Sequence, residues 1–76
     1  MSEALVLGAA VVWGPRRMPA IVLQVVGEQV ELAYRRRREL RTAFTAIKHV
    51  ETSANTREHQ RIAADVAPRL QLALFP

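Results

Sequence analysis

The sequence predicts a mainly β fold with a C-terminal helix, in a single domain that spans residues 1–76. Two observations lead to this prediction. Between Leu5 and Tyr34, short runs of Val, Ile and Leu are interrupted by glycine and proline, a pattern typical of short strands joined by turns. After residue 55, apolar side chains recur every four residues, which is the spacing of one face of a helix.

The composition limits what this domain can be. The chain has 76 residues, of which 50% are hydrophobic, and no cysteine, so no disulfide can support so small a core. A close-packed barrel or an oligomer would supply the missing burial. No apolar run approaches the roughly 18 residues of a membrane span. The start, Met1-Ser2-Glu3, lacks the basic residues of a secretory signal, so we expect a cytoplasmic protein with no membrane contact.

The first two strands are placed by the turn residues around them. We expect the first strand near Ala9–Trp13, because Gly14-Pro15 ends the apolar run. A loop, Arg16–Pro19, leads to the second strand at Ala20–Val26. That strand is apolar at nearly every position, so neither of its faces can lie against water. We therefore expect other parts of the protein to cover both faces.

The third strand, Gln29–Tyr34, follows a short turn at Gly27-Glu28. Its residues alternate between apolar and polar, which predicts one buried and one solvated face.

Residues 35–51 fit two structures. The first is a basic hairpin tip with a fourth strand at Leu40–Phe44, a 3₁₀ turn around Thr45–Ile47 and a fifth strand that ends at Glu51. The second is a helix, because Leu40, Phe44, Ile47 and Val50 also form a helical stripe. We favour the hairpin, and the helix would give an α+β fold in which a β-meander precedes two helices.

The C-terminal helix is predicted over residues 55–75. Asn55 followed by Glu58 is a plausible N-cap with its reciprocal carboxylate. Pro68 lies inside the apolar repeat, so we expect a kink or a break there. The apolar positions that define the buried face are Ile62, Val66, Leu70 and Leu74.

This order of elements resembles the SH3-like small barrels, the group of the chromo-type, Tudor, PWWP and KOW domains. Residues Gly8–Gly14, followed by Pro19–Val22, look like the opening of a PWWP or Tudor domain. The segment Ala46–Val50 looks like the turn into the closing strand. The resemblance covers about residues 8–51 and implies a five-stranded barrel, with the kinked amphipathic helix 55–75 packed on the barrel or on a partner subunit.

The net charge of the chain is concentrated in one stretch. Eleven basic residues and seven acidic residues give +4, and the five arginines and one glutamate of Arg35–Arg41 account for all of it. Consecutive arginines repel one another unless an anionic partner or nearby acids such as Glu39 offset the repulsion. Guanidinium groups bind phosphate in a bidentate manner. The stretch therefore predicts a small module that binds DNA or RNA through phosphates without reading sequence.

The candidate nucleic-acid site combines this stretch with arginines of the earlier loop and with aromatic side chains that can stack on bases. The phosphate-binding candidates are Arg35, Arg36, Arg37, Arg38 and Arg41, supported by Arg16 and Arg17, and the stacking candidates are Tyr34 and Trp13.

Catalytic chemistry finds little support in the sequence. There is no cysteine nucleophile and no glycine-rich phosphate loop, so we expect no enzyme and no cofactor. His49 and His59 lack partners at metal-ligand spacing. We expect both to be surface histidines and predict no metal site.

A second hypothesis belongs to a different class of function. The chain is then a protein-interaction or self-assembling module, whose interface is the apolar strand Ala20–Val26 together with the apolar end Leu70–Phe75. In that case the arginine stretch is a solvated loop that opposes edge-to-edge association of strands. The two hypotheses are compatible, because a dimer would double the basic surface.

Overall fold

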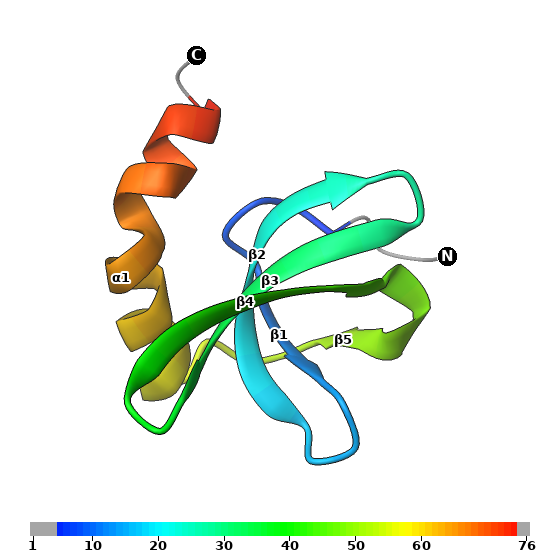
Figure 1. Ribbon diagram of the computed structural model, residues 1–76, viewed down its shortest axis with the longest axis horizontal. Coiled ribbons are helices and arrows are strands. Elements are labelled where there is room, and N and C mark those ends of the chain that lie inside the picture. Colours follow the sequence, from blue (N-terminus) through cyan, green and yellow to red (C-terminus); the bar gives the residue numbers. More distant parts are fainter. Residues whose placement is uncertain (1–4, 75–76) are drawn as a thin grey trace.

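The computed structural model describes the main chain of residues 5–74 and the side chains of residues 5–70. Five antiparallel strands are followed by one α-helix (Figure 1). The mainly β fold with a C-terminal helix that the sequence predicts is therefore confirmed. In chain order the elements are β1 (Ala10–Trp13), β2 (Met18–Val26), β3 (Gln29–Arg36), β4 (Glu39–Ala46), the 3₁₀ helix η1 (Ile47–His49), β5 (Val50–Thr52) and α1 (Arg57–Leu74).

All five strands belong to one sheet with the order β4-β3-β2-β1-β5. The sheet is strongly twisted, and β4 crosses β2 at a steep angle in Figure 1. β5 is three residues long and pairs with β1, and among the described residues β4 and β5 are the two unpaired edges of the sheet. The sheet is consequently open, and the closed barrel expected from the sequence is not seen.

β2 is covered on both faces, as its apolar sequence predicts. On one face Ala20 and Val22 pack with apolar residues of β1 and β3. On the other face Ile21 and Leu23 pack beneath α1. The register against β3 shifts between Val22 and Gln24, and such a bulge bends the strand.

The burial of β2 limits the self-assembly hypothesis. Residues 20 to 23 are at most 2% exposed, so the middle of β2 cannot serve as an interface between copies. The other part of that predicted interface, the apolar end Leu70–Phe75, lies beyond the described side chains except for Leu70, which packs against the buried cluster beneath α1.

Residues 35–51 form the hairpin, and the helical alternative for them is wrong. β3 and β4 pair residue for residue along their whole length. Leu40 and Phe44, which also fit a helical stripe, lie on one face of a strand and are 43% and 54% exposed. The strand pairing extends to Ala46, so the 3₁₀ helix begins at Ile47, two residues later than predicted.

The cap of α1 lies one residue later than the sequence prediction. Thr56, not Asn55, precedes the helix, and its Oγ1 accepts a hydrogen bond from the backbone N–H of His59 at 3.4 Å. In return the backbone N–H of Thr56 donates to Nδ1 of His59 at 3.2 Å. His59 thus fills the position that glutamate usually takes in a capping box. The predicted reciprocal carboxylate, Glu58, does not fill it.

His59 is buried, which corrects the expectation of a surface histidine. Its side chain is 1% exposed, and its Nε2 donates to the carbonyl oxygen of Val11 at 2.8 Å. Nδ1 lies 2.8 Å from Oγ1 of Thr56. Both ring nitrogens are hydrogen-bonded, as a buried imidazole requires. The first turn of α1 is thereby attached to β1.

One face of α1 packs on the sheet, and the helix continues past Pro68. Ile62 and Val66 are buried against β2 and β3, so the predicted apolar face is confirmed over these residues. The predicted break at Pro68 does not occur. Proline has no backbone N–H, so the carbonyl of Ala64, one turn earlier, lacks its helical hydrogen bond. Ala64 and Pro68 both lie on the exposed side of α1, where water can bind this carbonyl. No helix in residues 5–74 is long and apolar enough to cross a membrane.

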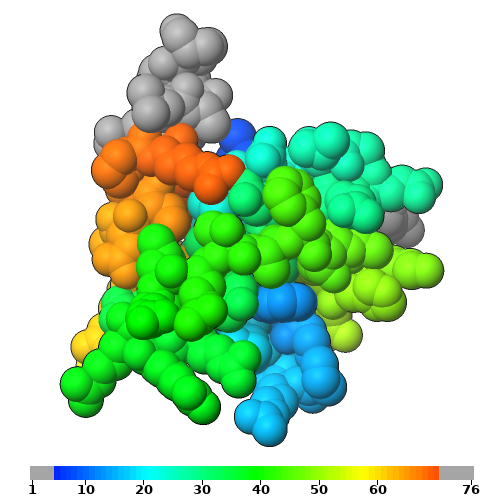
Figure 2. Space-filling view, in the orientation of Figure 1, coloured from blue at the N-terminus to red at the C-terminus, as the bar shows by residue number. Residues whose placement is uncertain are grey.

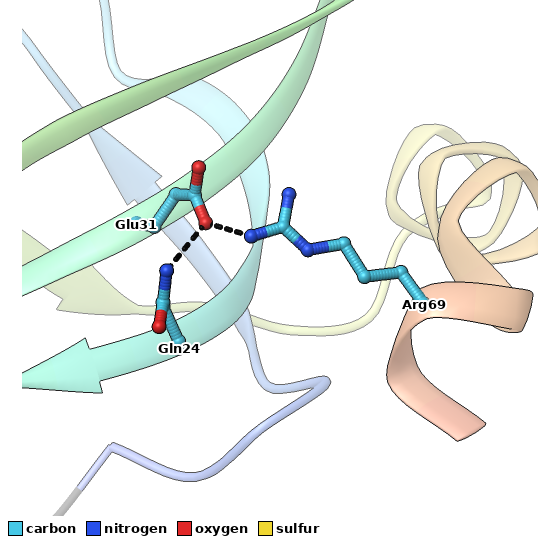
Figure 3. Close-up of polar contacts among 3 residues, drawn as sticks. All are labelled: Gln24, Glu31 and Arg69. Carbon is cyan, nitrogen blue, oxygen red and sulfur yellow. Dashed lines mark hydrogen bonds and ion pairs between the residues drawn. The ribbon is translucent and has the colours of Figure 1, made fainter. Parts of the chain in front are cut away.

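A polar contact attaches the second half of α1 to the sheet. Glu31 lies on the face of β3 that the sequence predicts to be solvated, and this prediction is wrong because α1 covers that face: Glu31 is 8% exposed and Ala33 is fully buried. Glu31 accepts a hydrogen bond from Nε2 of Gln24 at 3.0 Å. The same carboxylate oxygen pairs with the guanidinium of Arg69 (Figure 3). The charge of the buried carboxylate is thus matched by a cation from α1.

Candidate nucleic-acid interface

Two hairpins end at the same end of the sheet. β2 begins next to the point where β3 ends, because Ile21 pairs with Ala33. The tip of the β1–β2 hairpin, residues 14–17, and the tip of the β3–β4 hairpin, residues 37–38, therefore both lie at the lower end of the molecule in Figure 1. We call this region the basic end; it comprises residues 14–17 and 35–41, together with the carboxylates that pair with their arginines. It brings together the two arginine groups that the sequence separates.

The backbone at both tips adopts the left-handed conformation. Among the described residues, the non-glycine residues with positive φ are Arg17 (50°), Arg37 (52°) and Arg38 (67°). Arg37 and Arg38 are the two central residues of a two-residue hairpin turn, with φ positive at both, as in a type I′ turn. Asn-Gly is the preferred sequence there, because a side chain with a Cβ raises the energy of this conformation. Each left-handed arginine is thus a local cost in stability.

Three of the predicted phosphate-binding arginines form ion pairs within the chain. Arg35 contacts Asp65 of α1 at 3.2 Å, which joins β3 to the helix. Arg41 contacts Glu39 of its own strand at 2.9 Å. Arg17 contacts Glu51 of β5 at 2.9 Å. The sequence identified Glu39 as a possible partner, but Glu51 and Asp65 are distant in the chain and carry no local signal for these pairs.

Four arginines of the basic end form no ion pair with the described residues. They are all exposed, and they occur at both hairpin tips and at the last residue of β3. This group, which we call the free arginines, is Arg16, Arg36, Arg37 and Arg38.

The two arginines at the end of β3 point to opposite faces, because side chains alternate along a strand. Arg35 lies on the α1 side, where Asp65 pairs with it. Arg36 shares the other face with Tyr34 and with Arg41, the cross-strand neighbour of Tyr34. A strand geometry therefore cannot present the whole run Arg35–Arg38 to one ligand surface.

The predicted stacking residues pack against each other. The rings of Trp13 and Tyr34 have centroids 5.5 Å apart and an interplanar angle of 65°, an edge-to-face arrangement. Both are half-buried and border the cluster of β1, β2 and β3 residues. Nε1 of Trp13 is buried and has no hydrogen-bond partner among the described residues. These rings support the core beneath the basic end and do not offer two free faces to bases.

The charge of the basic end equals that of the whole chain. It contains seven arginines and three carboxylates, a surplus of four positive charges, and the other charged residues of the chain cancel. Figure 2 shows the arginine-bearing hairpins, in green and in blue, next to each other along the lower edge. Such a concentration of one sign attracts polyanions over distances near the Debye length.

Comparisons with known proteins give no further indication of function. No family model, no curated protein and no solved structure matches the chain.

Among the described residues, no group of three or more His, Asp or Glu side chains lies close enough together to hold a metal ion.

Proposed function

We propose that the protein is a small nucleic-acid-binding module that contacts phosphates through the basic end. The observation that carries the proposal is the identity of the left-handed residues: arginine occupies all three such non-glycine positions in the described chain, at the tips of two hairpins that end together. Costly backbone conformations persist where function requires a particular side chain. Glycine or asparagine would be more stable at these positions and would lose the cations.

The proposed contacts are made by the free arginines. Arg16, Arg36, Arg37 and Arg38 have no intramolecular ion pair to break among the described residues, so phosphate contact costs only their hydration and side-chain freedom. Arg35 and Arg17 act indirectly by joining their hairpins to α1 and β5, and Arg41 is paired within β4. Because the aromatic rings pack on each other, we propose binding to the backbone of the nucleic acid without base readout.

Fluorescence anisotropy of labelled DNA and RNA, each single- and double-stranded, tests this proposal at two salt concentrations. Binding that weakens steeply with salt is the expected result. The variant Arg37→Ser with Arg38→Ser should weaken binding. The matched control, Arg57→Ser with Arg61→Ser, removes two exposed arginines of α1 and should bind nearly as well as the parent. Equal losses in both variants, or no binding at low salt, would contradict the proposal.

We also infer that the sheet belongs to the SH3-like group, which includes the chromo-type, Tudor, PWWP and KOW domains. The strand order β4-β3-β2-β1-β5, the bulge within β2 and the 3₁₀ helix before β5 support this inference. A solution structure in which these three features are absent would contradict it. The proposal retains the cytoplasmic location expected from the sequence, where nucleic acid is available.

A further inference from the structure

β4 is an open edge of the sheet, on the opposite side from β5. β4 has eight residues and pairs on one side with β3, and no other strand of the described chain pairs with it. An edge of this length presents a row of backbone donors and acceptors to solvent. The edge also carries two large exposed apolar side chains, Leu40 at 43% and Phe44 at 54% exposure.

The turn geometry determines which backbone groups face outward. In a two-residue hairpin the residues that flank the turn, here Arg36 and Glu39, form a hydrogen-bonded pair. Odd-numbered residues of β4 therefore direct their N–H and C=O groups toward β3. The backbone groups of Leu40, Thr42 and Phe44 then point toward the open edge. The same three side chains share the α1 face of the sheet, because their partners on β3 face α1.

We propose that two copies of the chain associate through their β4 edges, about a two-fold axis that passes between Thr42 of one copy and Thr42 of the other. In this antiparallel register Leu40 of each copy lies opposite Phe44 of the second copy. By symmetry two such Leu40–Phe44 pairs form on the α1 face of the joined sheet, and each pair covers exposed apolar surface. The outward backbone groups of both copies meet in hydrogen-bonded pairs, and the two open sheets become one sheet of ten strands.

The two neighbouring symmetric registers are less favourable. An axis through Arg41 sets the two Arg41 side chains directly opposite each other, and like charges in such positions repel. An axis through Ala43 places Leu40 opposite Ala46 and leaves Phe44 beside Thr42, so the apolar pairs are lost. The Thr42 register avoids both defects and overlaps nearly the whole strand.

The dimer is independent of the proposed nucleic-acid function, because the free arginines all lie outside β4, and the β4 edge pairs through backbone groups and the side chains of Leu40 and Phe44. The two-fold axis places the two basic ends at opposite ends of the joined strands. A dimer therefore retains both sets of free arginines at the surface, and loss of the dimer leaves each basic end intact.

Single cysteines test the register directly, because the chain has none of its own. In a hydrogen-bonded antiparallel pair the Cα atoms are about 5.5 Å apart, within the range of a disulfide. Under mild oxidation Thr42→Cys should link two copies efficiently. Arg41→Cys and Ala43→Cys should link poorly. In this register residue 41 of one copy lies opposite residue 43 of the other, so two identical cysteines at either position are two residues apart along the strands. Preferential linking of Arg41→Cys or Ala43→Cys would overturn the register.

Sedimentation equilibrium of the full chain tests the interface. The parent should form a dimer, and Phe44→Lys should raise the dimer dissociation constant by about tenfold or more. The control, Val26→Lys, places the same charge on a 56%-exposed apolar side chain outside the interface and should dimerise like the parent. Circular dichroism verifies that both variants are folded. A parent that stays monomeric, or a folded Phe44→Lys variant that dimerises as well as the parent, would overturn the proposal.

Discussion

Arg37 and Arg38 occupy both central positions of the β3–β4 turn, each with positive φ, at 52° and 67°. Replacing them with Asn and Gly, the residues that a type I′ turn prefers, should raise the free energy of unfolding by about 1–2 kcal/mol. The same change, Arg37→Asn with Arg38→Gly, should weaken nucleic-acid binding, because it removes two free arginines. Urea denaturation followed by circular dichroism measures the first effect. A destabilised double variant would show that the arginines are not strained.

The hairpin illustrates what the sequence can and cannot predict. Apolar runs and turn residues are sufficient for the strands up to Tyr34 and for the buried face of α1, because those signals are local. The choice between hairpin and helix for residues 35–51 depends on pairing with β3, which no local pattern contains. The open sheet likewise depends on the short length of β5.

The candidate site is predictable in composition but not in detail. The sequence contains the seven arginines of the basic end, yet strand alternation directs Arg35 away from Arg36. Asp65 and Glu51 reach their arginines from elements far along the chain. His59 resembles a surface residue in the sequence because a histidine in place of the capping-box glutamate is an uncommon signal.

Releasing Arg35 should strengthen binding to nucleic acid. Asp65→Asn removes its partner, which lies at 3.2 Å and is 43% exposed, and leaves an unpaired cation at the basic end, on the face of β3 opposite to Arg36, where it adds to the attraction of the polyanion. The affinity should rise about two- to fivefold, while stability changes by about 0.5 kcal/mol or less, since the pair is partly solvated. Glu58→Gln makes the same charge change elsewhere on α1. If both variants bind equally well, the effect is one of net charge and not of Arg35.

The contact between His59 and Val11 should be important for stability. His59→Ala leaves the Val11 carbonyl without its partner and opens a cavity, at an expected cost of about 3 kcal/mol. Thr56→Ala removes the hydroxyl that caps α1 and contacts Nδ1 of His59, but the backbone N–H of residue 56 still donates to that nitrogen, so the change should cost about 1 kcal/mol. Urea denaturation of both variants provides the comparison. The assignment fails if the cap variant is the less stable of the two.

Glu31 and Arg69 should be energetically coupled. Arg69→Met leaves the 10%-exposed Glu31 side chain without its cation, and because Arg69 is itself 48% exposed the expected loss is about 1–2 kcal/mol. Glu31→Gln in the same chain should recover part of that loss, because a neutral amide requires no counter-charge. A double-mutant cycle measures the coupling. Strictly additive losses would mean that the two groups do not interact.

The salt dependence of binding tests the central proposal most directly. Anisotropy titrations of duplex DNA over a range of salt concentrations give the slope of log affinity against log salt. If the free arginines Arg16, Arg36, Arg37 and Arg38 each neutralise one phosphate, the slope is about −4. The double variant Arg37→Asn with Arg38→Gly loses two of these cations, so its slope should be shallower, at about −2. An unchanged slope in that folded variant would contradict phosphate binding by the β3–β4 tip.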